Sequence, residues 1–324
     1  MSGSSGKSRQ LAVVAAAMAD DLRAAALTAR ALGFAALQLD VRLGNLDITQ
    51  LSQSGRREVR SILRSRDLDL SGLRFDLGSK AAQSLPSYPL SPVRRGEGQG
   101  EGLGPRADID ASLDRVESVL EAAAGLQCPL VCIDLGPLPA PLPSEKTPST
   151  ISPEIAGDII IPAARENKSE KSPRKFDTKF AASVDSALAE LGRRADRHGV
   201  MIAFRSDLSS FAALDRALKT AACQWFGVDL DPVAILTDDW PTDEIFSRLG
   251  NAIRHVRARD ALLGADRRTK PAIIGNGSVK WGQLLNNLES AGFNGWITLD
   301  PMELPNRKTA AANGVVALTQ FIRE

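Results

Sequence analysis

The stretch "LAVVAAAMADDLRAAALTARALGFAALQLD", residues 11–40, combines two short apolar runs with one longer helical pattern. Its first six and last six residues are almost continuously apolar, as strands buried on both faces usually are. Between them, Leu22, Ala26 and Ala29 recur at helical spacing, and Gly33 suits the end of a helix. The stretch therefore predicts a strand, a helix and a second strand in succession.

The same alternation continues along the whole chain. Candidate strands lie at residues 11–16, 35–40, 70–75, 129–135, 200–205, 226–231, 253–258 and 296–300. Helical patterns separate them, and eight strands alternating with eight helices predict an α/β fold, a single-domain (β/α)8 TIM barrel over residues 11–324. A doubly wound open sheet is the alternative. No G-x-G-x-x-G motif follows the first strand, which disfavours a dinucleotide site.

Composition limits the classes of partner. The net charge is +1, so no global field attracts the chain to nucleic acid or to a membrane surface, and we expect neither partner. No apolar run reaches the length of roughly 18 residues that a membrane span needs. The three cysteines, an odd number in apolar surroundings, disfavour a disulfide framework. A reducing compartment, the cytoplasm, is therefore expected.

The N-terminal stretch "KSRQLAVVAAAMAD", residues 7–20, resembles a secretory signal because basic residues precede a short apolar run. The alternative is a first buried strand, and we favour it because the repeating pattern needs a strand there. Residues 1–10 are then predicted to be a disordered N-terminus.

Two segments interrupt the pattern after the third and fourth strands. Residues 78–106 are rich in Gly, Pro, Ser and Arg, and residues 137–175 are rich in Pro, Ser, Lys and Glu. Both are predicted to be long loop insertions. Since loops that follow barrel strands lie on the carboxyl-terminal face, these insertions are lids over an active site or disordered loops.

The ordered motifs "GVDLDPVAIL", "HVRARDA", "IGNGSVKW" and "GWITLD" resemble those of xylose isomerase-like barrels of the sugar phosphate isomerase/epimerase type. The resemblance covers most of the chain except the two insertions. It implies a TIM barrel that binds a divalent metal at the carboxyl ends of its strands. It also implies isomerase or epimerase chemistry, in which the metal polarises a sugar carbonyl.

The family's metal ligands are a Glu ending strand five, an Asp ending strand six, the His of an H-x-K-D motif, and a Glu ending strand eight. The matching positions here are, in that order, Arg205, Asp231, Arg257 and Asp300, with Arg259 and Asp260 completing the motif. Two expected ligands are thus arginines, which cannot ligate a cation and repel one. We expect an eroded metal site and no metal cofactor.

The arginines near the strand ends suggest what replaces the metal. Arg74, Arg205, Arg257 and Arg259 either neutralise neighbouring aspartates or bind an anion through their guanidinium forks. Arg42, after the second strand, and Arg56 and Arg57, on the next helix, are expected to join this site. The alternative is a solvated helix face and an ion pair with Asp40. These residues predict a possible pseudoenzyme that binds a small anionic, phosphate-like or sugar-like ligand without standard metal catalysis.

The alternative is an active isomerase or epimerase with a weak or displaced metal. Its candidate catalytic residues are Asp231, Asp260, Asp300 and His255. His255 acts as a base in that reading, whereas a lone histidine on a buried strand is more often a satisfied core residue. An abasic-site endonuclease of the same superfamily is disfavoured, since that chemistry needs several histidines and this chain has two. Neither the substrate nor the oligomeric state follows from the sequence.

Overall fold

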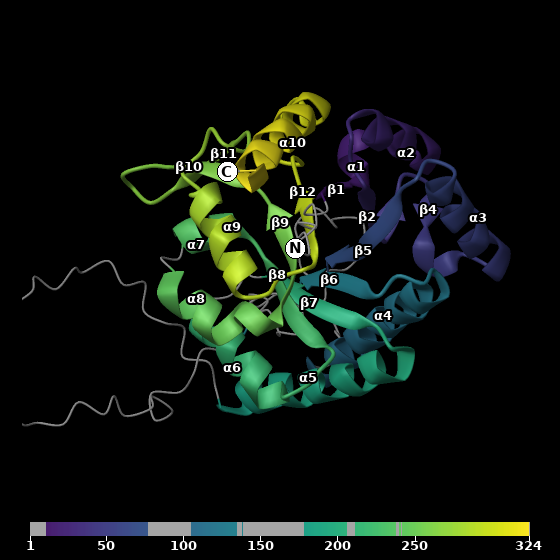
Figure 1. Cartoon of the computed structure of the whole chain (residues 1–324). Helices are drawn as coiled ribbons and strands as arrows, with labels where there is room; N and C mark the ends of the chain where they lie inside the picture. The colour runs from purple at the N-terminus through teal and green to yellow at the C-terminus, as the bar shows by residue number, and fades with distance from the viewer. Residues whose placement is uncertain are drawn as a thin grey trace, which may run out of the picture.

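Eight parallel strands close into a barrel in the computed structural model, which describes residues 11–76, 105–134, 138, 178–205, 211–237, 240 and 242–323. In chain order, which is also their order around the barrel, the strands are β1 (Leu11–Val14), β2 (Ala36–Asp40), β5 (Asp69–Asp76), β6 (Leu130–Asp134), β7 (Met201–Arg205), β8 (Phe226–Leu230), β9 (Ile253–Ala258) and β12 (Trp296–Leu299). The last strand pairs with the first through Ala12 and Thr298, which closes the ring (Figure 1). The predicted (β/α)8 barrel is confirmed.

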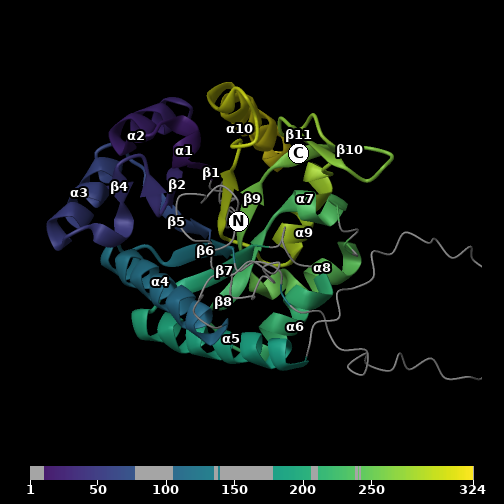
Figure 2. The same ribbon diagram turned by 180° about the vertical axis from the view of Figure 1, so that it is seen from behind.

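Helices surround the barrel in both views (Figures 1 and 2). They are α1 (Ala15–Met18), α2 (Leu22–Ala31), α3 (Gln53–Arg64), α4 (Pro105–Gly125), α5 (Thr178–His198), α6 (Phe211–Ala221), α7 (Pro232–Thr237), α8 (Thr242–Leu249), α9 (Trp281–Ser290) and α10 (Arg307–Arg323). Short 3-10 turns span Ile48–Gln50 and Gly250–Ala252. Two small hairpins add β3 (Arg42–Leu43) with β4 (Leu46–Asp47), and β10 (Asp260–Leu263) with β11 (Thr269–Ala272).

The first strand–helix–strand unit forms as its sequence predicts. The Asp21 side chain accepts a hydrogen bond from the backbone N–H of Ala24 and so caps the start of α2. Gly33 follows α2 with φ +86°, a left-handed conformation that glycine adopts without strain. Every residue of β1 is buried, because helices cover its outer face and the barrel interior covers the other.

The barrel interior changes character along its axis. Leu130, Cys132 and Ala203 form a small apolar cluster near the amino ends of β6 and β7, and Met201 packs against it. Toward the carboxyl ends the interior becomes polar. The candidate site therefore stands on an apolar floor inside a closed barrel.

Several expectations fall on other parts of the chain. The N-terminal residues 1–10 lie outside the described residues. So do the two insertions, apart from 105–106, which begin α4, and Leu138, which is buried. Their expected disorder or lid role stays a prediction. Among the described helices, none is long and apolar enough to cross a membrane.

Candidate functional site: an arginine–aspartate network at the barrel mouth

Four arginines and several aspartates meet at the carboxyl ends of the strands. Arg74 lies near the end of β5, Arg205 ends β7, and Arg257 lies next to last in β9. Arg259 follows β9 directly. Parallel strands place their carboxyl ends on one face of the barrel, so these side chains share the mouth with the acids that end neighbouring strands.

Asp300, directly after β12, is the centre of the network. Its Oδ2 accepts a hydrogen bond from Arg74 at 2.9 Å, and the guanidinium of Arg257 lies 3.6 Å from the same oxygen. Burial opposes ionisation of Asp300, but the charges of Arg74, Arg257 and Arg259 outweigh it and hold the pKa of its carboxyl below the usual range. Asp300 is therefore a buried anion held by guanidinium groups.

Asp40, at the end of β2, is the most unusual carboxyl group of the network. Arg74 donates through Nε to its Oδ1 at 2.6 Å. Its Oδ2 is buried and has no hydrogen-bond partner among the described residues. Burial raises the pKa of Asp40, and the nearby Arg74 only partly opposes that rise. One carboxyl oxygen of Asp40 is thus both closed off from solvent and unsatisfied within the described residues.

His255 and Asp229 form a layer beneath the arginines. His255 Nδ1 lies 2.6 Å from Asp229 Oδ1, and its Nε2 lies 2.7 Å from the Thr298 hydroxyl. A carboxylate only accepts hydrogen bonds, so Nδ1 donates to Asp229. Both ring nitrogens are engaged and the side chain is fully buried. The structure therefore places His255 as a satisfied interior residue, below the mouth and away from a ligand.

Asp229 joins that layer to the mouth. Its other oxygen accepts a hydrogen bond from Arg257 at 3.1 Å. Burial would raise the pKa of this carboxyl, but Arg257 and His255 hold it well below the usual range. Arg257 thus bridges two buried carboxylates, Asp229 and Asp300, and its own side chain is only 3% exposed. A fixed internal cation stands at the position where the sequence resemblance implies a metal-binding histidine.

Arg205 occupies the position of the strand-five Glu and is also paired. It donates to Asp76 Oδ1 at 3.0 Å and lies 3.8 Å from Asp134 Oδ2. Its carboxylate partners come from the ends of β5 and β6. Arg42, in contrast, pairs with Asp47 in the β3–β4 hairpin, so its expected pairing with Asp40 is not found.

Arg259 closes another side of the mouth. It lies 2.5 Å from Asp231 Oδ2 and donates to Glu303 Oε1 at 2.6 Å. The other oxygen of Asp231 accepts from the backbone N–H of Val233 at 2.9 Å. The one family ligand that is unchanged in identity is therefore already engaged on both oxygens.

Asp260 lines a small pocket together with Arg259 and Asp300, but its carboxylate is engaged by its own loop. It accepts hydrogen bonds from five N–H groups, namely the backbones of Ala261, Gly275, Gly277 and Val279 and the indole of Trp281. These bonds fasten the loop that precedes α9. A carboxylate so fully occupied has a structural role beside the network.

The residues present do not fit the family's divalent metal. Arginines stand at two ligand positions, and the carboxylates of Asp231 and Asp300 at the other two already face guanidinium groups. Around them, among the described residues, seven carboxylates surround four guanidiniums: Asp40, Asp76, Asp134, Asp229, Asp231, Asp300 and Glu303 against Arg74, Arg205, Arg257 and Arg259. In this described network the acidic groups outnumber the basic ones.

Three other buried residues, Cys132, Asp229 and His255, carry side chains of the types that bind metal ions. Ligand atoms of Cys132, Asp229 and His255 all lie within 4.8 Å of one another, and all three residues are buried. Burial raises the pKa of the Cys132 thiol well above its usual value, so the thiolate that binds metals is disfavoured. Asp229 is also shared with Arg257. A cation at this trio would have to displace existing interactions.

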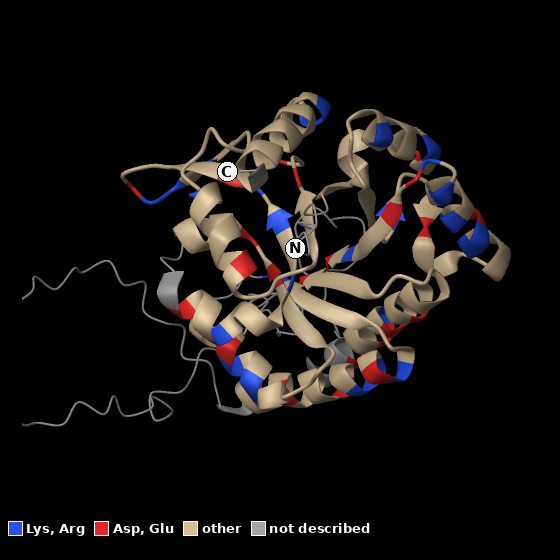
Figure 3. Cartoon of the chain, viewed as in Figure 1, with Lys and Arg blue, Asp and Glu red and all other residues tan. Residues whose placement is uncertain are grey.

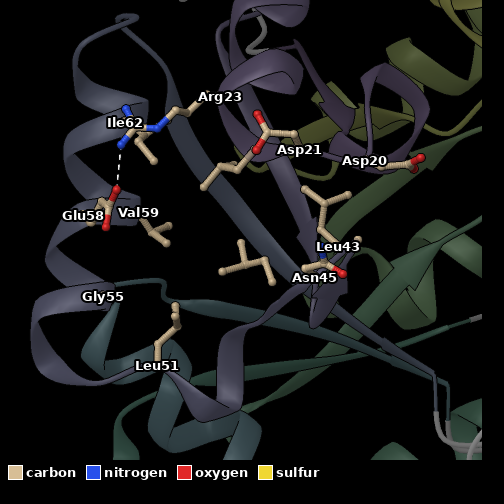
Figure 4. A pocket seen from close by; sticks show the side chains of 13 residues that line it. Asp20, Asp21, Arg23, Leu43, Asn45, Leu51, Gly55, Glu58, Val59 and Ile62 are labelled. Carbon is tan, nitrogen blue, oxygen red and sulfur yellow. Dashed lines mark hydrogen bonds and ion pairs between the residues drawn. The ribbon is translucent and has the colours of Figure 1, made fainter.

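A separate recess of about 570 Å³ lies outside the barrel between α2, the β3–β4 hairpin and α3 (Figure 4). Leu43, Leu51 and Val59 point into it, and the ion pair between Arg23 and Glu58, 2.6 Å apart, crosses one side. None of the network residues lines this recess. The recess therefore lies apart from the barrel mouth.

Three carboxylates of the network, Asp76, Asp134 and Asp229, are not predicted from the sequence. A signal exists for Asp229, because it lies two residues before Asp231 and strand periodicity places both on one face. The pairing of Arg205 with Asp76 joins residues far apart in the chain. No local pattern indicates it.

Comparisons with known proteins agree with this architecture. A protein family described as xylose isomerase-like TIM barrel matches residues 26–321. No curated protein matches the chain.

Solved structures resemble it at low sequence identity. A xylose isomerase domain protein from Planctomyces limnophilus has a TM-score of 0.66 and 14% identity, covering 97% of this chain and 96% of its own. D-psicose 3-epimerase from Clostridium cellulolyticum, solved with D-tagatose, has a TM-score of 0.64 and 13% identity, and the match covers 97% of this chain and 99% of the epimerase. A xylose isomerase-like TIM barrel protein from Mycobacterium smegmatis, solved with magnesium, has a TM-score of 0.63 and 12% identity, covering 99% and 98%. At these identities the likeness shows the fold alone.

Proposed function

Because this chain belongs to the xylose isomerase-like TIM barrel family, we propose that it binds a small sugar-like or anionic ligand at the barrel mouth without metal-dependent turnover. The observation that carries the proposal is the position of Arg257. Its guanidinium bridges Asp229 and Asp300 at the place where the family has a metal-binding histidine. An internal cation there occupies the electrostatic role of a metal but offers no open coordination position.

The mouth suits a ligand rich in hydroxyl groups. The partly exposed pairs Arg74–Asp40, Arg205–Asp76 and Arg259–Glu303 each combine a donor with an acceptor. Sugar hydroxyls both donate and accept, so such alternating pairs match them. The free oxygen of Asp40 adds one more acceptor.

The balance of charges at the barrel mouth narrows the class of ligand further. Among the described residues, seven carboxylates around four guanidiniums disfavour a multiply charged phosphate at this mouth, because every one of these guanidiniums already faces an acid. We therefore place neutral sugars and singly charged sugar acids ahead of sugar phosphates as ligands.

Thermal shift assays test the proposal. Monosaccharides, sugar acids and sugar phosphates are added singly to the purified protein, and a ligand that binds the native state raises Tm as its concentration rises. The variant Asp40→Asn, which removes the carboxylate partner of Arg74, is expected to lose the shift. Arg193→Gln on α5, whose side chain is 70% exposed, is the control and keeps it. A shift that Asp40→Asn leaves unchanged would place the ligand elsewhere.

The second candidate is an active isomerase or epimerase with a displaced metal. The trio Cys132, Asp229 and His255 favours it, since a thiolate, a carboxylate and an imidazole suit zinc or cobalt. Titration with Co²⁺ followed by absorption spectroscopy tests this candidate. A thiolate-to-cobalt band that disappears in Cys132→Ser would support it, and its absence in the wild-type protein would exclude this trio as the metal site.

A further inference from the structure

Helix α3 carries a stripe of arginines on its outer side. Arg57, Arg60 and Arg64, with Ser61 and Ser65, line an open recess of about 600 Å³. At a rise of 1.5 Å per residue, the three arginines span about 10 Å along the helix. Figure 3 shows basic residues gathered along α3. The chain as a whole has a net charge of only +1, so this stripe is a local concentration of positive charge.

These arginines lack the acidic partners that other arginines of the molecule have. Within the described residues, none of the three guanidiniums forms a hydrogen bond or ion pair. Acids on or next to α3 pair with other arginines, because Glu58 pairs with Arg23, Glu121 with Arg56 and Asp67 with Arg30.

The arginines of α5 provide the contrast. Arg193, Arg194 and Arg197 all form ion pairs, with Glu190 or Glu117 as partners. These three surface arginines are thus neutralised by neighbouring acids. The α3 stripe departs from that arrangement.

The stripe is unfavourable for the helix itself. Arg57 and Arg60 are three residues apart, and Arg60 and Arg64 are four apart, so like charges face each other along one side. The apolar residues that attach α3 to the barrel, Val59 and Leu63, lie on a different side of the helix. The Nε atom of Arg60 is also buried without a hydrogen-bond partner among the described residues. The fold gains nothing from this arrangement, which points to a ligand.

We propose that this recess binds a compact soluble anion that carries two or more phosphate groups. Guanidinium forks bind phosphate oxygens in a bidentate manner, and three of them within about 10 Å match neighbouring phosphates. The Ser61 hydroxyl adds a donor of the kind that commonly contacts phosphate. The Ser65 hydroxyl donates to the carbonyl of Ile62 and is already used.

The lining of the recess excludes other classes of partner. It consists of arginine and serine side chains, so it offers no aromatic surface on which nucleic-acid bases stack. It also offers no apolar anchor of the kind that dominates protein–protein interfaces. The recess lies on α3, which ends shortly before the amino end of β5, and it shares no residue with the mouth network. The inference is therefore independent of the proposed sugar site.

Calorimetric titration of the full chain with inorganic tripolyphosphate tests the inference. We expect saturable binding that weakens as salt concentration rises. The triple variant Arg57→Gln, Arg60→Gln, Arg64→Gln is expected to bind at least about tenfold more weakly, since it removes all three charge-assisted contacts. The matched control Arg193→Gln, Arg197→Gln, Arg268→Gln removes three arginines that are 70%, 63% and 89% exposed and lie outside α3, and it is expected to bind like the wild type.

Folding of the α3 triple variant is checked by its Tm, which we expect to equal or exceed that of the wild type because repulsion within α3 is removed. Absence of saturable binding by the wild type, or equal weakening in both triple variants, would overturn the inference. Two further probes decide the class of anion. A short DNA duplex or a glutamate-rich peptide that binds more tightly than tripolyphosphate would refute the assignment to a compact phosphate anion.

Discussion

Replacing Arg257 by methionine tests how the buried network is held together. The change keeps most of the side-chain volume but removes the cation between Asp229 and Asp300, whose side chains are 0% and 5% exposed. Removing one partner of a buried ion pair typically costs about 3–5 kcal/mol. Asp229 retains its bond to His255, and Asp300 retains its bond to Arg74. We therefore expect the free energy of unfolding to fall by about 3 kcal/mol, the lower end of that range.

The loss should depend on pH in a defined direction. In the wild type the pKa values of Asp229 and Asp300 are lowered in the folded state. A lowered pKa contributes stability above the unfolded value of about 3.9, and that contribution fades as pH falls through the folded value. Without Arg257 both carboxyls take up protons at higher pH. The difference between wild type and variant should thus be largest near neutral pH and shrink in acid.

Urea unfolding followed by tryptophan fluorescence measures both effects, at neutral pH and at about pH 4. Arg193→Met is the control, because an exposed substitution of this kind usually changes stability by less than about 0.5 kcal/mol. Adding Asp229→Asn to the Arg257 variant should recover part of the loss, since one uncompensated charge is removed. A loss below about 1 kcal/mol, or one that grows in acid, would refute the account of the network.

Three further predictions concern single residues. Asp260→Ala leaves several N–H groups without an acceptor, so we expect the free energy of unfolding to fall by about 3 kcal/mol. The loop before α9 should also be cleaved faster by proteases. An unchanged urea unfolding curve would contradict this prediction. Burial raises the pKa of Cys128 to about 12 and that of Cys132 well above its usual value, so neither thiol should react with Ellman's reagent until the protein is denatured. Gly44→Ala should lower stability by at least about 1 kcal/mol in the same urea assay, because Gly44 has φ +56° and an added Cβ would meet the Asp20 carbonyl.

The barrel could be predicted because its strands have an unambiguous pattern. Most barrel strands are buried on both faces and therefore read as short apolar runs, and each observed strand begins and ends within two residues of its predicted bounds. The hairpins were not predicted. The β3 and β4 strands have two residues each, and β11 contains Pro271, which disfavours a strand in any sequence pattern.

The candidate site could be predicted in part. Strand ends locate Arg205, Arg257 and Asp300 at the mouth, since the carboxyl ends of barrel strands form one face. Which acid each arginine contacts depends on register across the barrel and on side-chain direction. Arg74, for instance, bonds to Asp300, which is 226 residues away. A single sequence holds no local signal for such a pair.

An arginine–aspartate network stands where the sequence resemblance places a metal. Elemental analysis of the purified protein, followed by calorimetric titration with Mn²⁺ and Mg²⁺, checks whether the network leaves room for one. We expect no stoichiometric metal in the purified protein and no saturable binding of either ion, because guanidinium groups already face Asp231 and Asp300. One tightly bound equivalent that is lost in Asp231→Asn and Asp300→Asn would contradict it.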